Sequence, residues 1–209
     1  MVKVYKKRIL IVTDFKSSIG GIETYLDDLK KILDQNDYKV QIIWVEGHIN
    51  FFKKIFYLIL SFFNFWAPTI LKKEIAIFRP DIVWFHSVSK YWWWKVFEGL
   101  DEFWWEVWAM YHDWTLFAPF AGEVYDLKDI PRIWSKQEFL SKLKRPNFFK
   151  KMYAQAKFWR NSKIRDALLR WVDKHIVPSE FMVDVLSNWG ANPARTYVLP
   201  HFAKNLKTV

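Results

Sequence analysis

Cysteine is missing from the 209-residue chain, and glycine is scarce, with only 6 residues. The absence of cysteine excludes disulfide frameworks, thiolate metal sites and cysteine nucleophiles. Neither the dinucleotide fingerprint G-x-G-x-x-G nor the phosphate-loop pattern G-x-x-x-x-G-K-S/T occurs, and no two histidines have the spacing of a metal site. These absences argue against a dehydrogenase, a P-loop nucleotide hydrolase and a metal site.

The residues that are present suit one folded domain. Hydrophobic residues make up 52% of the chain and charged residues 26%, which is enough for a packed core. A length of 209 residues fits one domain of the usual ~100–200 residues and leaves no room for two full α/β lobes. The N-terminal apolar run ends at Asp14 and has no small-residue cleavage site, so it predicts a first strand and no signal peptide.

The order of the apolar segments predicts an α/β fold. Residues 8–13 form a β-branched run typical of a buried parallel strand, and residues 21–33 repeat apolar positions at helical spacing behind a glycine pair. A strand over residues 40–45 would complete a βαβ unit. Four further strands, separated by helices, are expected at residues 82–86, 105–111, 175–177 and 196–199.

This alternation predicts a doubly wound parallel sheet, in which ligands bind at the carboxyl ends of the strands. Ser179 and Gly190 are placed to start and to end the helix between the last two strands. Residues 115–160 are the least regular part of the chain, because prolines punctuate them. An insertion of that length inside a compact domain is expected to have a functional role.

Aromatic and uncharged segments predict contact with a membrane surface. Residues 55–71 form a 17-residue uncharged run flanked by lysine pairs, and 8 of the 14 tryptophans lie between Trp84 and Trp114. A helix of that length extends roughly 25 Å and does not span the hydrocarbon core of ~30 Å. A helix within residues 51–72 that lies in the interface is one interpretation, and an ordinary buried helix is the other. The predicted membrane contacts are Lys53, Lys54, Phe62, Trp66, Trp92 and Trp93.

The positive charge is concentrated in one segment. Residues 142–174 hold 11 lysines and arginines against 2 acidic residues, a charge of +9 out of +10 for the whole chain. Such a segment can face nucleic acid phosphates, anionic lipid headgroups or a phosphorylated substrate, or it can be a solvated helix face. No DNA- or RNA-reading motif is present, so nucleic acid is the least favoured of these partners.

The glycine pair Gly20-Gly21 is the strongest candidate for a phosphate contact. It stands at the start of the predicted helix, where free N–H groups and the helix dipole favour an anion such as a diphosphate. A tight turn would explain the pair equally well.

Five segments taken in order resemble the N-terminal domain of family 4 glycosyltransferases. The first is the strand at residues 8–14 with the helix start Gly-Gly-Ile-Glu-Thr-Tyr. The other four are residues 79–86 (RPDIVWFH), 108–113 (WAMYHD), 172–181 (VDKHIVPSEF) and 195–202 (RTYVLPHF).

This resemblance implies a Rossmann-like domain of a two-domain GT-B enzyme. Residues 1–203 would be the acceptor-side domain, including an acceptor-side insertion at residues 115–160, and residues 204–209 would be a remnant of the hinge. The donor-binding domain of such enzymes carries the nucleotide and an acidic motif, and it is not among these residues. The chain would therefore be a fragment or a natural half that needs a separate C-terminal domain, and it is expected to be inactive alone.

The resemblance also implies roles for individual residues. Gly20 and Gly21 would face the diphosphate of a nucleotide-sugar, which is the donor substrate, and no cofactor is expected. His112 would be the catalytic residue beside the donor sugar in a transfer that retains the anomeric configuration, unless it is a structural histidine. The acceptor-binding residues would be Glu23, His86 and Asp113, with a structural role as the alternative for His86, because it lies at a strand end.

These expectations combine into one functional hypothesis and one alternative. The hypothesis is the acceptor-binding half of a nucleotide-sugar-dependent glycosyltransferase, acting on a lipid-linked or polysaccharide acceptor. Such a protein would be cytoplasmic and peripheral on the inner face of the membrane, bound through an anionic surface or its acceptor. The alternative is a non-catalytic module that binds a glycan or a membrane with the same fold.

Overall fold

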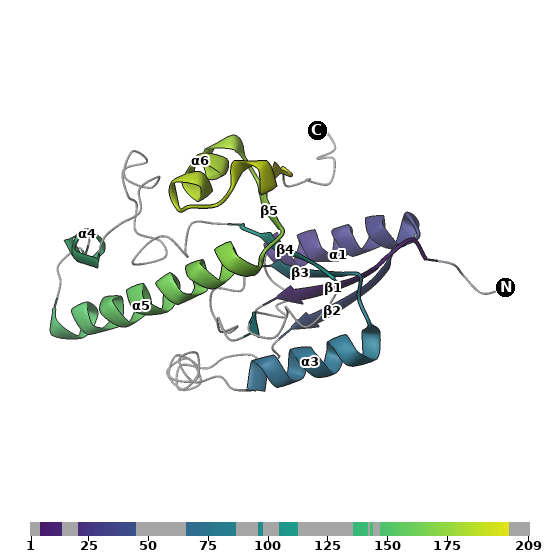
Figure 1. Ribbon diagram of the computed structural model, residues 1–209, viewed down its shortest axis with the longest axis horizontal. Coiled ribbons are helices and arrows are strands. Elements are labelled where there is room, and N and C mark those ends of the chain that lie inside the picture. Colours follow the sequence, from purple (N-terminus) through teal and green to yellow (C-terminus); the bar gives the residue numbers. More distant parts are fainter. Residues whose placement is uncertain are drawn as a thin grey trace, which may run out of the picture.

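The computed structural model describes residues 5–13, 21–44, 66–86, 96–97, 105–112, 136–141, 143 and 147–200. Six strands in these ranges form one parallel sheet in the order β2-β1-β3-β4-β5-β6 (Figure 1). The strands are β1 (Arg8–Thr13), β2 (Lys39–Trp44), β3 (Ile82–His86), β4 (Glu106–Met110), β5 (Lys174–Val177) and β6 (Thr196–Val198). The predicted doubly wound α/β fold is confirmed.

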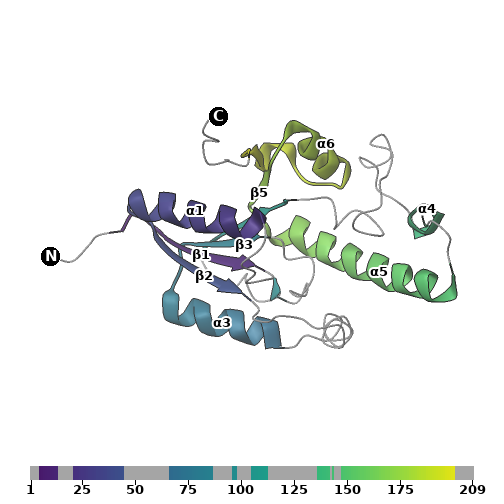
Figure 2. The same cartoon turned by 180° about the vertical axis from the view of Figure 1, so that it is seen from behind.

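Helices cover both faces of this sheet. The helices are α1 (Gly21–Gln35), α3 (Trp66–Phe78), α4 (Lys136–Ser141), α5 (Phe148–Trp171) and α6 (Glu180–Asn188), with a short 3-10 helix η2 (Pro193–Arg195) before β6. Helix α1 packs on one face, whereas α3 and α5 lie on the other (Figures 1 and 2).

The alternation of side chains along each strand creates the two cores. In β1, Ile9 and Ile11 join the core beneath α1, and Leu10 and Val12 join the core shared by α3, α5 and α6. All five residues of the central strand β3 are buried, as expected of a parallel strand covered on both faces.

Two carboxylates fix the register where strands begin. The Arg8 N–H donates to Asp81 Oδ2 at 2.6 Å, while the Asp81 N–H donates to the Arg8 carbonyl at 2.8 Å. Asp173 makes the same two bonds between β4 and β5. The Val107 N–H donates to Asp173 Oδ2 at 2.9 Å, and the Asp173 N–H donates to the Val107 carbonyl at 2.8 Å. Each aspartate directly precedes its own strand, so the pair of bonds ties β1 to β3 and β4 to β5 near the points where these strands begin.

Helix ends are set by local chemistry. Asn147 caps α5, because its side chain accepts a hydrogen bond from the Lys150 N–H at 2.8 Å. Gly190 ends α6 with φ of +104°, a conformation that residues with a Cβ rarely adopt. Ser179 occupies the N-cap position of α6 as predicted, but its side chain makes no capping hydrogen bond.

Two described segments bear on the sequence-based expectations. Helix α3 begins inside the 55–71 run, with Pro68 in its first turn, where proline is tolerated. Leu71, Ile75 and Phe78 of α3 are buried in the core, which fits the buried-helix interpretation for this end of the run; residues 55–65 lie outside the described residues. Regular helix also reaches into residues 115–160, because α5 starts at Phe148. Among the described residues, no helix combines the length and the apolar character needed to cross a bilayer.

Candidate functional site

Two histidines meet at the carboxyl ends of the central strands. His86 is the last residue of β3, and His112 follows β4 by two residues on the same face as Met110, the register partner of His86. The His86 Nδ1 and His112 Nε2 atoms are 3.0 Å apart, and the ring centroids are 5.2 Å apart. Thr13, the last residue of β1, pairs with His86 in register and is also buried. The predicted site therefore lies at the sheet edge where α/β folds bind ligands.

Helix α1 brings its first turns to the same place. The Tyr25 ring packs edge-on against His112, with centroids 5.4 Å apart, and lies 6.1 Å from the His86 ring. Gly21, the first residue of α1, precedes Tyr25 by four residues, which is roughly 6 Å along a helix axis. The N-terminal end of α1, with its partial positive charge, therefore lies within about one turn of the histidine pair.

The contact between His86 and His112 limits which of their ring nitrogens can carry a proton. His86 is fully buried and His112 is half-buried. Only one of the two facing nitrogens can carry the proton of a hydrogen bond at 3.0 Å, because two N–H groups would repel each other. Burial raises the pKa of Tyr25 to about 12, so its phenol stays neutral near pH 7. The cluster offers polar rings at a strand edge, with no carboxylate among these described groups.

A second buried pair lies on the opposite face of the same strand. Tyr111 directly precedes His112, and its hydroxyl is 2.8 Å from His175 Nδ1 in β5. Burial, with a smaller contribution from the positive charge of Arg195, lowers the pKa of His175 to about 4. Burial also raises the pKa of Tyr111. Consecutive residues after β4 thus contribute to two separate polar pairs, one under α1 and one in the core beside α5 and α6.

The structure brings together only part of the predicted site. His86 and His112 are in direct contact, and the backbone of Gly21 lies nearby. The Glu23 side chain, Gly20 and Asp113 lie outside the described residues, as do five predicted membrane contacts and the side chain of the sixth, Trp66. Thus the predicted contacts of Glu23 and Asp113 with an acceptor, and those of Lys53, Lys54, Phe62, Trp92 and Trp93 with a membrane, stay predictions.

Sequence reasoning missed Thr13 and Tyr25. Thr13 was read only as the end of the first strand, although that position faces the ligand edge of a parallel sheet. Tyr25 stands three residues after Ile22 on the apolar side of the helix, a spacing that could have indicated an aromatic residue facing the sheet. His86 was predicted to bind the acceptor, with a structural role as the alternative; it is fully buried, and its contact with His112 was not foreseen.

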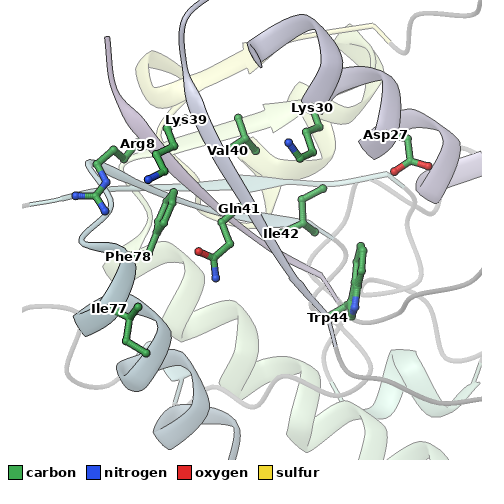
Figure 3. A pocket seen from close by; sticks show the side chains of 10 residues that line it. All are labelled: Arg8, Asp27, Lys30, Lys39, Val40, Gln41, Ile42, Trp44, Ile77 and Phe78. Atoms are coloured by element: carbon green, nitrogen blue, oxygen red, sulfur yellow. The ribbon is translucent and has the colours of Figure 1, made fainter. Parts of the chain in front are cut away.

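Two other features lie away from the pair. Within the described ranges no three histidine or acidic side chains gather into a group that could hold a metal ion. A pocket of about 680 Å³ runs along the edge strand β2, between α1 and α3, and Figure 3 shows the side chains that line it. Its lining includes Arg8, Lys39 and Phe78, and β1 separates it from β3 and His86. This pocket is therefore not part of the histidine site.

Comparison with solved structures gives distant similarity to HepE and to a galactosyltransferase. HepE from Anabaena in complex with UDP shares 12% identity with a TM-score of 0.47, and the match covers 94% of this chain and 44% of HepE. The complex of HepE with UDP-glucose gives 12% identity and a TM-score of 0.45, with the same coverage of both chains. The lipopolysaccharide outer core galactosyltransferase WaaB shares 13% identity with a TM-score of 0.46, over 97% of this chain and 47% of WaaB.

The sequence itself carries the assignment to a family. A search of curated proteins finds no match. The chain spans less than half the length of HepE and WaaB. The profile of the family described as Glycosyltransferase Family 4 matches residues 19–203, which include the start of α1 and both histidines of the pair. The chain therefore belongs to glycosyltransferase family 4.

Proposed function

We propose that this chain is the acceptor-binding, N-terminal domain of a retaining GT-B glycosyltransferase that uses a nucleotide-sugar donor. The observation that carries the proposal is the contact between His86 and His112 beside the N-terminus of α1, at the carboxyl edge of the sheet. A polar cluster at this edge, next to a helix N-terminus, suits a ligand that joins a sugar to a diphosphate. A separate or covalently linked donor-binding domain would close the other side of the site.

His112 is the residue that we assign to the reacting sugar. Its half-buried ring is held through Nε2 by the fully buried His86. His86 acts as a positioning residue in this proposal, because its contact fixes the orientation and the tautomer of His112. The N–H groups at the start of α1, with Gly20 and Gly21, would face the donor diphosphate.

The acceptor is proposed to be lipid-linked or a polysaccharide presented at the inner face of the membrane. The support is the excess of positive charge in residues 142–174, at +9, together with the density of tryptophan between Trp84 and Trp114. Aromatic rings stack on sugar rings and also prefer the membrane interface, and lysine and arginine attract anionic headgroups. Glu23 and Asp113 would contribute polar contacts to the acceptor.

The test is sugar transfer by the chain combined with a C-terminal donor-binding domain. Transfer from a labelled nucleotide-sugar should fall about a hundredfold or more in His112→Ala, since a positioned acid–base or electrostatic group contributes that much. His86→Ala should lower the turnover rate, and His86→Asn should restore part of it because its amide can still bond to His112. His175→Gln is the matched control, a buried histidine on the other face whose replacement should leave turnover unchanged.

Three outcomes would contradict parts of the proposal. Equal turnover by the wild-type chain and His112→Ala would refute the role of His112. A product with inverted anomeric configuration, read by nuclear magnetic resonance, would refute the retaining mechanism. If no donor-binding domain restores transfer while glycan or vesicle binding persists, the chain is a non-catalytic binding module.

A further inference from the structure

The first half of α5 exposes apolar side chains to solvent. Phe148 is 70% exposed, Phe149 78%, Met152 54% and Trp159 48%. Figures 1 and 2 show this end of the helix extending beyond the sheet, next to α4. Exposed apolar residues usually occur singly, so these four together with Tyr153, which is 36% exposed, within twelve positions of one helix indicate a contact surface.

Helix geometry gathers these residues on one side. Phe148, Met152 and Trp159 follow helical spacing, with Phe149 beside them. The opposite side is already occupied, because the fully buried Ala154 packs with Leu143 of the α4 connection. The second half of the helix is anchored in the main core through buried residues such as Ile164 and Leu168. The exposed side is therefore a fixed feature of a helix that is held at both ends.

Positive charge surrounds this apolar side. Between Phe148 and Trp171 there are seven lysines and arginines, of which Lys157 and Arg160 are buried, and Asp166 is the one acidic residue. Lys151 and Lys163 are exposed beside the apolar residues. Such a combination, apolar side chains bordered by lysines, is typical of an element that lies in the interface of an anionic bilayer.

We propose that the aromatic face of α5, formed by Phe148, Phe149, Met152 and Trp159, inserts into the surface of an anionic membrane. Phenylalanine and methionine have no polar atom for a phosphate and suit the acyl boundary, while the lysines reach the headgroups. A second copy of the chain is disfavoured, because two strongly basic surfaces would repel each other. The inference rests on the proposed function, because insertion of α5 would place the acceptor site beside an acceptor carried by the membrane. It places membrane contact within the basic segment 142–174, away from the six individual membrane contacts predicted from the sequence.

The experiment measures binding of the whole chain to two kinds of vesicle, phosphatidylcholine alone and phosphatidylcholine mixed equally with phosphatidylglycerol. The paired variant Phe148→Ser/Phe149→Ser should bind the anionic vesicles about a hundredfold more weakly, because burying each ring corresponds to roughly tenfold in affinity. Its matched control is Ile32→Ser/Ile77→Ser, which removes two exposed isoleucines of α1 and α3 and should bind like wild type. Circular dichroism and urea unfolding confirm that both variants fold.

Charge is tested separately. Lys151→Glu/Lys163→Glu should weaken binding to the anionic vesicles by more than tenfold, with a steep dependence on salt. The control Lys72→Glu/Lys73→Glu makes the same change in net charge on exposed residues of α3 and should have a much smaller effect. Equal losses in both charge variants would overturn the assignment to α5, since they would indicate attraction by net charge alone.

Other results would also overturn the inference. One is that Phe148→Ser/Phe149→Ser binds anionic vesicles as tightly as the wild-type chain. The others are that the wild-type chain does not bind these vesicles, or that binding is lost only in Phe62→Ser/Trp66→Ser. A dimer in sedimentation that Phe148→Ser/Phe149→Ser makes monomeric, without vesicle binding, would assign the face to a second copy. An oligonucleotide that binds the face in place of vesicles would assign it to nucleic acid. Transfer to a water-soluble acceptor analogue reports on the proposed function independently, and it should not change in the phenylalanine variant.

Discussion

Replacing His175 with glutamine should make the protein less sensitive to mild acid. His175 is buried beneath α6, 2.8 Å from the Tyr111 hydroxyl, and its pKa falls from 6.5 to about 4. The unfolded chain therefore takes up this proton at a higher pH than the folded chain. The stability that neutral His175 contributes is complete above about pH 6.5 and is lost as the pH falls towards 4.

The size of this loss follows from the two pKa values. Proton linkage gives a decrease in the free energy of unfolding of about 2 kcal/mol between pH 7 and pH 5, and about 3 kcal/mol by pH 4. A domain of this size is stable by only about 5–15 kcal/mol, so the effect of one histidine should be measurable. Glutamine cannot titrate in this range, and its amide can still bond to the Tyr111 hydroxyl.

The assay is urea unfolding followed by tryptophan fluorescence at pH 7 and pH 5, for the wild-type chain and His175→Gln. The loss between the two pH values should be about 2 kcal/mol smaller in the variant. Tyr111→Phe is the control, because it removes the hydrogen bond but leaves a buried titratable histidine, and it should keep most of the acid sensitivity. Identical pH dependence in the wild-type chain and His175→Gln would refute this account of the buried pair.

Two further predictions concern backbone geometry and register. Gly190→Ala should lower the free energy of unfolding by roughly 1 kcal/mol. The added Cβ would meet Leu169 Cδ1 at 3.4 Å, an ordinary contact, so the cost comes from the backbone φ of +104°. An unchanged urea midpoint would contradict this prediction. Asp81→Ala should lower the free energy of unfolding by about 1 kcal/mol, because it removes the acceptor of the Arg8 N–H. Asp81→Asn should lower it less, because the amide oxygen can accept the same bond. Equal losses of stability in the two variants would argue against a contribution from this bond.

The strands were predictable because continuous runs of apolar, mostly β-branched residues indicate buried strands. The β-branched runs of β1 and β3 have the predicted bounds, and the other strands differ by one or two residues at their ends. Helix α5 was harder to foresee, because its exposed side carries Phe148, Phe149 and Trp159 while Lys157 and Arg160 are buried. Its apolar period therefore does not follow the usual rule of an apolar inner face and a polar outer face.

The candidate site was predictable in its residues but not in its contacts. His86 and His112 each end an apolar run, which places both at the carboxyl edge of a parallel sheet. Their direct contact depends on the β3–β4 register, which pairs His86 with Met110, and on two residues of chain beyond it. No local pattern encodes that register, because β3 and β4 are joined by a long connection. Residues 113–135 and 14–20, which hold Asp113 and Gly20, lie outside the described part of the chain.

In the two segments around β3 and β4 that resemble family 4 glycosyltransferases, successive side chains point to opposite faces of the sheet, so some pack in the core and others reach the candidate site. In residues 79–86, Asp81 fixes the start of β3, Val83 and Phe85 enter the core beside α5, and His86 faces α1. In residues 108–113, Tyr111 and His112 point to opposite faces of the sheet. A match to such a segment is therefore strong evidence of fold, since most of its residues serve packing. The histidine pair, on the α1 face at the carboxyl edge, is therefore the feature whose proposed role in function is to be tested.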